Sequence, residues 1–234
     1  MTGSIWMDSI KVIRMTKKEE RELKKAQLFE KEKERTEQMK EYEYKYSDCA
    51  YIAGVDEVGR GPFCGPVVTC AVILPKDEPI YYLNDSKKLS EKKREELYEI
   101  IMDKAISVSI GIRDHKRIDE INILQATYEA MRDSVAGLKV KPDIILVDAV
   151  TIPDIDIPQC PIIKGDAKSI SIAAASIVAK VTRDRMMVEY DKMYPGYDLA
   201  SNKGYGSPKH IEALKELGPC PIHRRSFIKN YVNG

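Results

Sequence analysis

Four acidic side chains stand where their surroundings would ordinarily be apolar. Asp56 and Glu57 end the segment YIAGVDEV, Asp148 follows the apolar run of PDIILVDA, and Asp184 lies in the long apolar pattern SISIAAASIVAKVTRDR. Carboxylates that converge in a dry cleft repel one another and shift each other's pKa values unless a cation neutralises them. We therefore expect these acids to form a site for a hard divalent cation with oxygen ligands, either Mg²⁺ or Mn²⁺.

Acid clusters of this kind hold two metal ions about 3.5–4 Å apart in nucleases and polymerases. The ions activate a water molecule and stabilise the departing oxygen, so the chemistry would be metal-assisted phosphodiester hydrolysis. The chain has three histidines and five cysteines without a CxxC spacing. This composition favours neither a zinc site nor a disulfide framework, and we expect reduced thiols.

Each acid also has an ordinary structural explanation. Asp148 could cap a turn after its strand, and Asp184 could pair with Lys180, which contributes only about 0.2–0.5 kcal/mol. Glu57 follows Asp56 directly, and neighbours on a strand point to opposite faces. Both can serve one site only through a bulge or at the strand's end.

The phase of the apolar helical pattern favours the site. Ser176, Lys180 and Asp184 recur every four residues, so they share one face of the predicted helix. The remaining positions of this segment are almost wholly apolar. A buried helix with one polar ridge usually lines a site.

Two glycine-flanked segments could recognise a ligand. Gly59 and Gly61 would let the backbone approach closely, its amides could reach a sugar hydroxyl, and Arg60 could pair with a phosphate. Tyr205, in NKGYGSPKH, could stack on a sugar or base. The ordinary alternatives are a hairpin turn and a half-buried tyrosine. Nine further polar and basic residues could form a track that contacts the phosphates of a nucleic-acid backbone: Asn84, Ser86, Lys87, Lys88, Lys203, Lys209, His223, Arg224 and Arg225.

The segments that carry these residues alternate between strand-like and helix-like spacing of their apolar residues. Strands at the beginning, followed by alternating helices and strands, predict a mixed sheet covered by helices, an α/β domain. The expected strands are 51–58, 65–74, 105–112 and 142–149, and the expected helices are 89–105, 119–138, 169–194 and 207–217.

Residues 1–50 differ in character from residues 51–234. Within them, residues 17–45 hold ten Lys or Arg and nine Glu, with no Gly or Pro. This pattern predicts a solvated helix that is docked weakly or free. An arm lying along a nucleic-acid backbone is the functional alternative, which the near balance of charge disfavours.

The composition gives no further sign of a partner. The formal net charge is +1, from 38 basic and 37 acidic residues in 234, so a nucleic-acid surface would have to be local. No apolar run approaches the roughly 20 residues of a membrane helix, and the N-terminus lacks a signal peptide. We expect a soluble, cytoplasmic protein without a membrane partner.

Taken in order, seven motifs resemble those of bacterial ribonuclease HII: VDEVGRGPFCGPVV, NDSKKLS, ILVDA, KGDAKS, AAASIVAKVTRDR, NKGYGSPKH and HRRSF. The resemblance covers roughly residues 51–227. It implies a ribonuclease H-like fold and a metal-dependent endoribonuclease that hydrolyses the RNA strand of RNA–DNA hybrids. It also implies nicking on the 5′ side of single ribonucleotides in duplex DNA, with 5′-phosphate and 3′-hydroxyl ends, as in ribonucleotide excision during replication and repair.

The resemblance also implies roles for individual residues. The family's metal ligands and catalytic acids correspond to Asp56, Glu57, Asp148 and Asp184. The triplet that senses the ribose 2′-hydroxyl and its phosphate corresponds to Gly59, Arg60 and Gly61. Tyr205 corresponds to the tyrosine that stacks on the following DNA sugar, and the backbone-contacting positions correspond to Asn84, Lys87 and Ser169. Val58 departs from the family, which usually has Ala there.

Two alternatives remain open from the sequence. Another ribonuclease H type, such as ribonuclease HI or HIII, would need longer RNA runs or a larger N-terminal domain. A non-catalytic module could bind hybrids without cutting them, although all four acids are present. We expect a monomer whose partners are RNA–DNA hybrids and ribonucleotide-containing duplexes.

Overall fold

A mixed five-stranded sheet forms the centre of the computed structural model, which describes residues 16–232. The strand order is β3-β2-β1-β4-β5. Strands β1, β2 and β3 are antiparallel neighbours, whereas β4 and β5 run parallel to β1. This mixed sheet confirms the predicted α/β class. The strands are β1 (Ile52–Val58), β2 (Val67–Ile73), β3 (Ser107–Arg113), β4 (Ile144–Asp148) and β5 (Gln159–Ile162).

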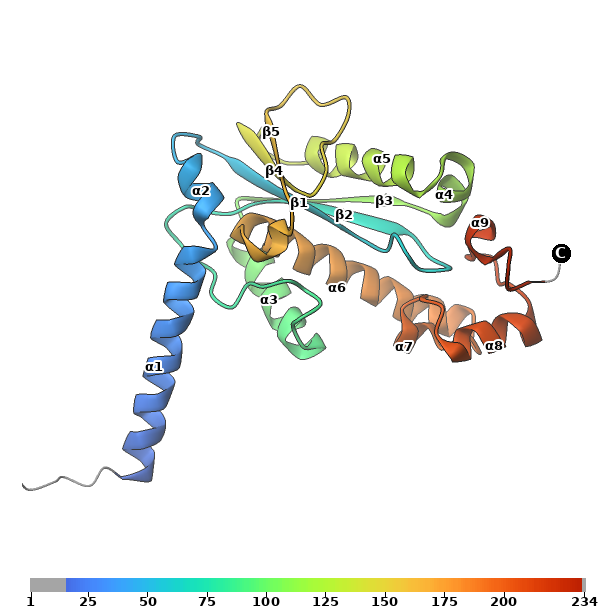
Figure 1. Cartoon of the computed structure of the whole chain (residues 1–234), viewed down its shortest axis with the longest axis horizontal. Helices are drawn as coiled ribbons and strands as arrows, with labels where there is room; N and C mark the ends of the chain where they lie inside the picture. The colour runs from blue at the N-terminus through green and yellow to red at the C-terminus, as the bar shows by residue number, and fades with distance from the viewer. Residues whose placement is uncertain (1–15, 233–234) are drawn as a thin grey trace, which may run out of the picture.

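Helices cover both faces of the sheet (Figure 1). Helices α4 and α5 lie on one face, and α3 and α6 lie on the other, with α7, α8 and α9 gathered at the far end of α6. Their bounds are α3 (Glu91–Lys104), α4 (His115–Ile121), α5 (Ile123–Ala136), α6 (Ile170–Met193), α7 (Leu199–Asn202), α8 (Pro208–Leu217) and α9 (Arg225–Ile228), with a 3-10 turn η1 (Gly165–Ala167) before α6. No helix among residues 16–232 is both long and apolar enough to cross a bilayer.

Alternation along β2 explains how one strand serves both layers. Val68 and Val72 pack in the cluster that contains the alanines of α6, whereas Ala71 packs with Met131 of α5. Successive strand side chains point to opposite faces. A strand buried on both faces therefore reads as a continuous apolar run, as β2 does.

Backbone contact fixes α6 against the sheet. A Cβ atom on Gly54 of β1 would lie 2.1 Å from the carbonyl carbon of Ser171. Only glycine permits this approach, because any other residue would clash with main chain that cannot rotate away. The contact sets where the later turns of α6 meet the end of β1.

The helix expected over 119–138 is two helices in the structure. Asn122 separates them with φ of +69°, and its Oδ1 accepts hydrogen bonds from the amides of Leu124 and Gln125. Asparagine caps helices well, which the periodicity alone did not indicate. Strand β5 and helices α7 and α9 were also not predicted, because four-residue elements carry too little pattern.

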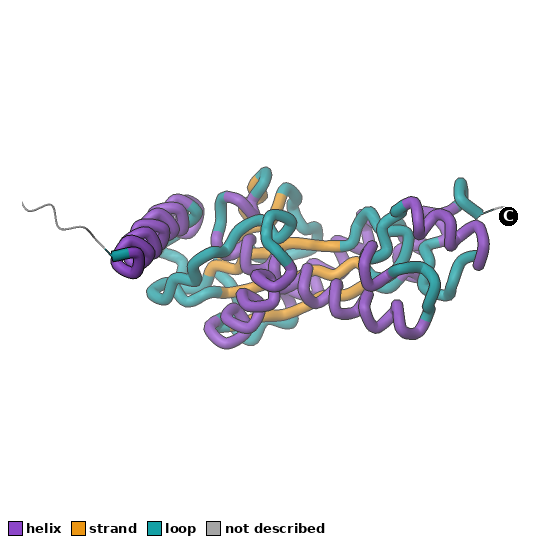
Figure 2. Tube along the Cα trace, turned by 90° about the horizontal axis from the view of Figure 1, so that it is seen from below, coloured by secondary structure: helices purple, strands orange, loops and turns teal. Residues whose placement is uncertain are grey.

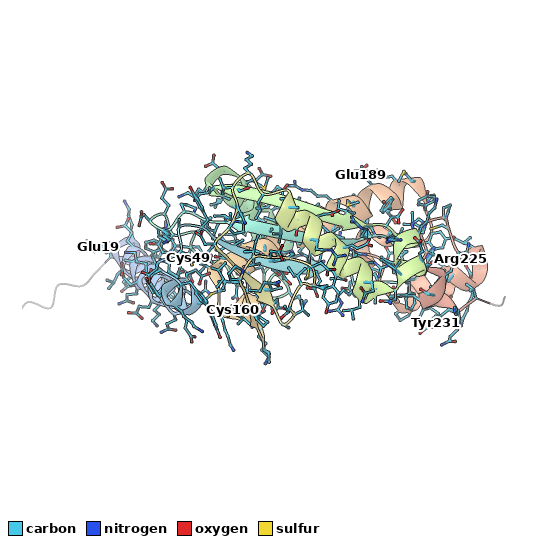
Figure 3. The ribbon with its side chains drawn as sticks, turned by 90° about the horizontal axis from the view of Figure 1, so that it is seen from above. Glu19, Cys49, Cys160, Glu189, Arg225 and Tyr231 are labelled. Carbon is cyan, nitrogen blue, oxygen red and sulfur yellow. The ribbon has the colours of Figure 1, made fainter. Side chains whose placement is uncertain are left out.

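The charged N-terminal segment forms α1 (Lys17–Gln38) and α2 (Glu41–Lys45). Helix α1 projects from the body (Figures 1 and 2), and Glu19 near its start lies at the opposite end of the molecule from Tyr231 (Figure 3). Its last turns are docked: Glu32 accepts from the amide of Tyr82, and Arg35 donates to the carbonyl of Leu83. The part of the predicted extension in residues 1–15 lies outside the described residues.

Candidate active site

Two of the acids lie side by side at one edge of the sheet. Strands β1 and β4 are parallel, and Val55 pairs with Val147. Asp56 and Asp148 are the next residues of the two strands, so both lie where the parallel pairing of β1 and β4 ends, at the C-terminal edge. Asp56 is buried, and the Oδ1 of Asp148 accepts a hydrogen bond from the amide of Gly165 at 2.7 Å.

Glu57 reaches the same cleft because β1 ends there. The pairing of β1 with β2 continues without a bulge to Val58 and Val68. On its other side the pairing of β1 with β4 ends at Val55, so the end of the parallel pairing, not a bulge, lets neighbouring carboxylates share one site. The backbone amide of Glu57 donates to Oδ1 of Asp56 at 2.7 Å. Both side chains line a cleft of about 280 Å³, together with Val58, Ser86, Lys87, Ser176, Lys180 and Tyr205.

Two residues of the polar ridge of α6, Ser176 and Lys180, line this cleft, whereas Asp184 is not one of its lining residues. Ser176 lies 3.0 Å from Ser86, hydroxyl to hydroxyl. Asp184 is buried, and its Oδ1 accepts from Nζ of Lys180 at 2.6 Å, with Arg94 3.8 Å from its other oxygen. The intrahelical pair is therefore formed, and a cation at Asp184 would have to compete with Lys180.

Among residues 16–232, Asp56 and Asp148 have no basic side chain within 4.0 Å, and Glu57 has only Arg60, at 3.4 Å. Burial raises the pKa of Asp56 well above its usual range, and the charges of Glu57 and Asp148 raise it further. Burial and Asp148 likewise raise the pKa of Glu57, which Arg60 opposes. The pKa of the half-buried Asp166 is also raised, by burial, by Asp85 and by Asp148. The cleft is thus short of positive charge.

This donor set fits a hard divalent cation, since it offers carboxylate oxygens in an electronegative and partly dry cleft. The acids stand apart from one another. Within residues 16–232, the one group that brings three ligand atoms within 4.8 Å of one another is Cys64, His210 and His223.

The GRG triplet and Tyr205 form one wall beside the acids. Gly59 has φ of +91°, a conformation that favours glycine. Arg60 is largely exposed, with Nη1 3.4 Å from Oε1 of Glu57. A Cβ atom on Gly61 would lie 3.6 Å from Cε1 of Tyr205, a residue that is 45% exposed. The two glycine-flanked segments are therefore neighbours in space.

The three residues that correspond to backbone-contacting positions, Asn84, Lys87 and Ser169, lie in different places. Lys87 is exposed and lines the cleft. Asn84 is half-buried and lines a neighbouring recess with Lys88 and Arg35. Ser169 is fully buried as the N-cap of α6, and its hydroxyl donates to Oε1 of Glu43. Its side chain serves the helix and the docked extension, not the cleft.

Two arginines that support this wall went unrecognised as such in the sequence. Arg183 and Arg224 are both fully buried, and their guanidinium groups donate to backbone carbonyls of the loops around the site. The expectation that His223 and Arg224 contribute to a solvent-facing phosphate track is wrong, because both are buried. Little in the sequence indicated the burial of these two arginines, since an Arg in TRDR or HRR is most simply interpreted as exposed.

A chain of hydrogen bonds supports the Tyr205 turn. The Nδ1 of His210 lies 2.9 Å from the carbonyl oxygen of Tyr205, the two Nε2 atoms of His210 and His223 are 3.0 Å apart, and Sγ of Cys220 is 3.1 Å from Nδ1 of His223. Because a carbonyl only accepts, His210 donates from Nδ1. Nδ1 of His223 lies near both the thiol and the carbonyl oxygen of Cys220, the latter at 3.2 Å. Burial lowers the pKa of both imidazoles, which favours their neutral forms.

We expect this chain to make stability depend on acid pH. Burial and His210 lower the pKa of His223 from 6.5 to about 4, and burial lowers the pKa of His210. The unfolded chain therefore takes up these protons first, so the free energy of unfolding should fall as pH falls from about 6.5 towards about 4. His223→Gln should show a smaller fall, measured by urea denaturation at pH 7, 5.5 and 4.5.

The half-buried His115 supplies the matched control for this prediction. Burial also lowers the pKa of His115, but this residue lies outside the chain of hydrogen bonds, so His115→Gln should retain more of the wild-type pH dependence than His223→Gln. An unchanged pH dependence in His223→Gln would show that the neutral pair does not set acid stability.

Comparison with known proteins gives a consistent family. The sequence profile of the family described as Ribonuclease HII matches residues 53–230. Ribonuclease HII of Lachnoclostridium phytofermentans is 69% identical over 202 residues, 86% of this chain and 80% of that protein. Ribonuclease HII of Caldanaerobacter subterraneus subsp. tengcongensis is 58% identical over 208 residues, 88% of this chain and 86% of that protein.

Solved structures agree at the level of the fold. The ribonuclease H2 of Pyrococcus horikoshii OT3 superposes with a TM-score of 0.64 at 28% identity, covering 77% of this chain and 96% of that chain. The RNase HII in its PCNA complex from Archaeoglobus fulgidus superposes with a TM-score of 0.64 at 27% identity, covering 78% and 97%. These likenesses confirm the ribonuclease H-like fold expected from the sequence.

Proposed function

The chain belongs to the ribonuclease HII family of metal-dependent endoribonucleases acting on RNA–DNA hybrids, and we propose that it also nicks duplex DNA at single ribonucleotides. The nick falls on the 5′ side of the ribonucleotide and leaves a 5′-phosphate and a 3′-hydroxyl. Substrates are RNA–DNA hybrids and ribonucleotide-containing duplexes. The activity serves ribonucleotide excision in DNA replication and repair.

One observation carries this proposal: Asp56, Glu57 and Tyr205 line a single small cleft, and the GRG loop begins two residues after Glu57, beside Tyr205. Gly61 faces the Tyr205 ring, while Glu57 and Asp56 continue directly into the same loop. A 2′-hydroxyl distinguishes RNA from DNA. Backbone amides at Gly59–Gly61 would recognise one ribose, and Tyr205 would stack on the next sugar, which needs only one ribonucleotide.

The chain's own groups have separable roles in this reaction. Asp56, Glu57, Asp148 and Asp184 hold the divalent ions, which we propose to be two Mg²⁺ or Mn²⁺. When bound, such ions supply an activated water nucleophile and charge stabilisation of the departing 3′ oxygen. Arg60 pairs with a phosphate next to the ribonucleotide, and Lys87 contacts the backbone at the cleft's rim. Lys180 orients Asp184 through their 2.6 Å contact.

The cellular location that we propose for this activity follows from its substrate. We propose that the enzyme acts as a monomer in the cytoplasm, where it can meet DNA duplexes. Residues 51–234 form the catalytic domain and residues 1–50 an extension, which we do not require for chemistry. Asn84 borders the docked part of that extension and contacts the nucleic-acid backbone beside it.

The test compares labelled duplexes that differ only in the length of their RNA. With Mg²⁺ or Mn²⁺, we expect a single nick 5′ to one embedded ribonucleotide, cleavage of an RNA–DNA hybrid, no cut in all-DNA duplex, and no product with EDTA. Cleavage of the hybrid alone would contradict the single-ribonucleotide proposal and indicate a need for longer RNA. Binding without any cleavage would indicate a non-catalytic hybrid-binding module.

A further inference from the structure

Arg224 is a buried cation that touches the GRG loop from behind. Its Nη2 donates to the carbonyl of Gly59 at 2.6 Å, its Nη1 to the carbonyl of Arg60 at 3.0 Å, and its Nε to the carbonyl of Gly65 at 3.0 Å. The residue is 0% exposed and comes from the segment before α9. The planar guanidinium group, which has five N–H donors, thus bonds to the carbonyls of a single loop, residues 59–65.

These bonds determine the orientation of two peptide planes. In a planar trans peptide, the carbonyl of one residue and the amide of the next point in opposite directions. Because the carbonyls of Gly59 and Arg60 point at buried Arg224, the amides of Arg60 and Gly61 point away from it. Both residues are exposed, and within residues 16–232 neither amide donates to another protein atom.

We propose that Arg224 is a positioning residue that aims the amides of Arg60 and Gly61 at the ribose 2′-hydroxyl and its neighbouring phosphate. This inference rests on the proposed function, since it names how that site selects a ribonucleotide. Arg224 touches no substrate itself. It fixes donors in advance, so that recognition does not require the loop to reorganise.

The charge on Arg224 contributes as well as its shape. Burial and the neighbouring Arg183 lower the pKa of Arg224, to about 9, so the group remains cationic at neutral pH. A cation bound to a carbonyl polarises that peptide and strengthens its amide as a donor. The pairing therefore favours an acceptor such as a phosphate or hydroxyl oxygen on the opposite side.

A second buried arginine makes the loop rigid. Arg183 donates to the carbonyls of Cys64 and Pro66 in the same loop, and to that of Lys203 before the Tyr205 turn. The two guanidinium groups thus hold the GRG loop from two directions. With Arg183 in place, loss of Arg224 should loosen the peptides at Arg60 and Gly61 and leave the rest of the loop tethered.

The first test measures selectivity, not total activity, because partial unfolding lowers activity without changing selectivity. In an Asp148→Asn background that prevents cutting, Kd is measured for a duplex with one ribonucleotide and for the all-DNA duplex. Arg224→Lys keeps the charge but cannot reach three carbonyls. It should lower the preference for the ribonucleotide duplex about 3–10-fold, the equivalent of one hydrogen bond.

Arg132→Met is the matched control, since Arg132 bonds the carbonyl of Pro153 far from this loop, and its ratio should equal that of the parent. An unchanged ratio in Arg224→Lys would overturn the inference alone. Absence of any preference in the parent would instead overturn the proposed function.

A measurement on the wild-type loop keeps the inference testable if Arg224→Lys does not fold. In the Asp148→Asn protein labelled with ¹⁵N, the amides of Arg60 and Gly61 should gain protection from hydrogen exchange with the ribonucleotide duplex. The all-DNA duplex should protect them less. Equal protection by both duplexes, or none with either, would show that these amides do not read the 2′-hydroxyl.

Discussion

Asp148→Asn should eliminate metal-dependent nicking while leaving the fold unchanged. The Oδ1 of Asp148 accepts a hydrogen bond from the amide of Gly165, and an asparagine oxygen can accept the same bond. The substitution therefore removes the negative charge with little change in shape. Outer contacts of metal sites contribute about 10–100-fold to affinity or activity, so loss of a direct ligand should exceed about 10²-fold.

The readout for this variant combines initial rates on the single-ribonucleotide duplex with thermal unfolding at several Mg²⁺ concentrations. Stabilisation by Mg²⁺ should be weaker in the variant than in the wild type, because less of the added metal binds the folded state. Asp154→Asn is the matched control, since Asp154 is exposed and lies outside the cleft, paired with Arg132. Retained nicking by Asp148→Asn would remove this residue from the metal site.

The location of the acids was largely predictable because chain direction fixes it. An apolar strand that finishes on Asp56 or Asp148 must deliver that carboxylate to the C-terminal edge, and two parallel strands bring both to one place. The ridge of α6 was predictable for the same reason, since a period of four residues is a property of the helix itself. Geometry that depends only on local sequence could thus be predicted without the structure.

The support behind the GRG loop was not predictable, because it depends on contacts distant in sequence. Arg224 becomes buried only when the carbonyls of Gly59, Arg60 and Gly65 surround it. Nothing in HRRSF indicates which arginine faces inwards. The burial of Ser169 has the same origin, since Glu43 of the docked extension occupies its hydroxyl.

Gly59→Ala should unfold the GRG loop and with it the activity. Gly59 adopts φ of +91°, and an added Cβ would lie 2.3 Å from Nε of Arg183 and 2.7 Å from the carbonyl oxygen of Pro66. A left-handed non-glycine residue alone costs about 1–3 kcal/mol. Because Arg183 is itself held by carbonyls, the clash cannot relax by a simple rotation, and the melting temperature should fall along with the nicking rate.

Gly61→Ala should hinder the approach of the substrate to the backbone without destabilising the fold. Its added Cβ would meet only Cε1 of Tyr205, at an ordinary 3.6 Å, so the melting temperature should stay near that of the wild type. The methyl group would nevertheless stand beside an amide that we expect to face the substrate, and displacement of a substrate by about 1 Å can cost about 10²-fold in rate. Nicking rates and thermal unfolding of both alanine variants check the contrast. A fully active Gly61→Ala would mean that the backbone there never approaches the sugar, and the role of the triplet would then reduce to the turn that Gly59 makes.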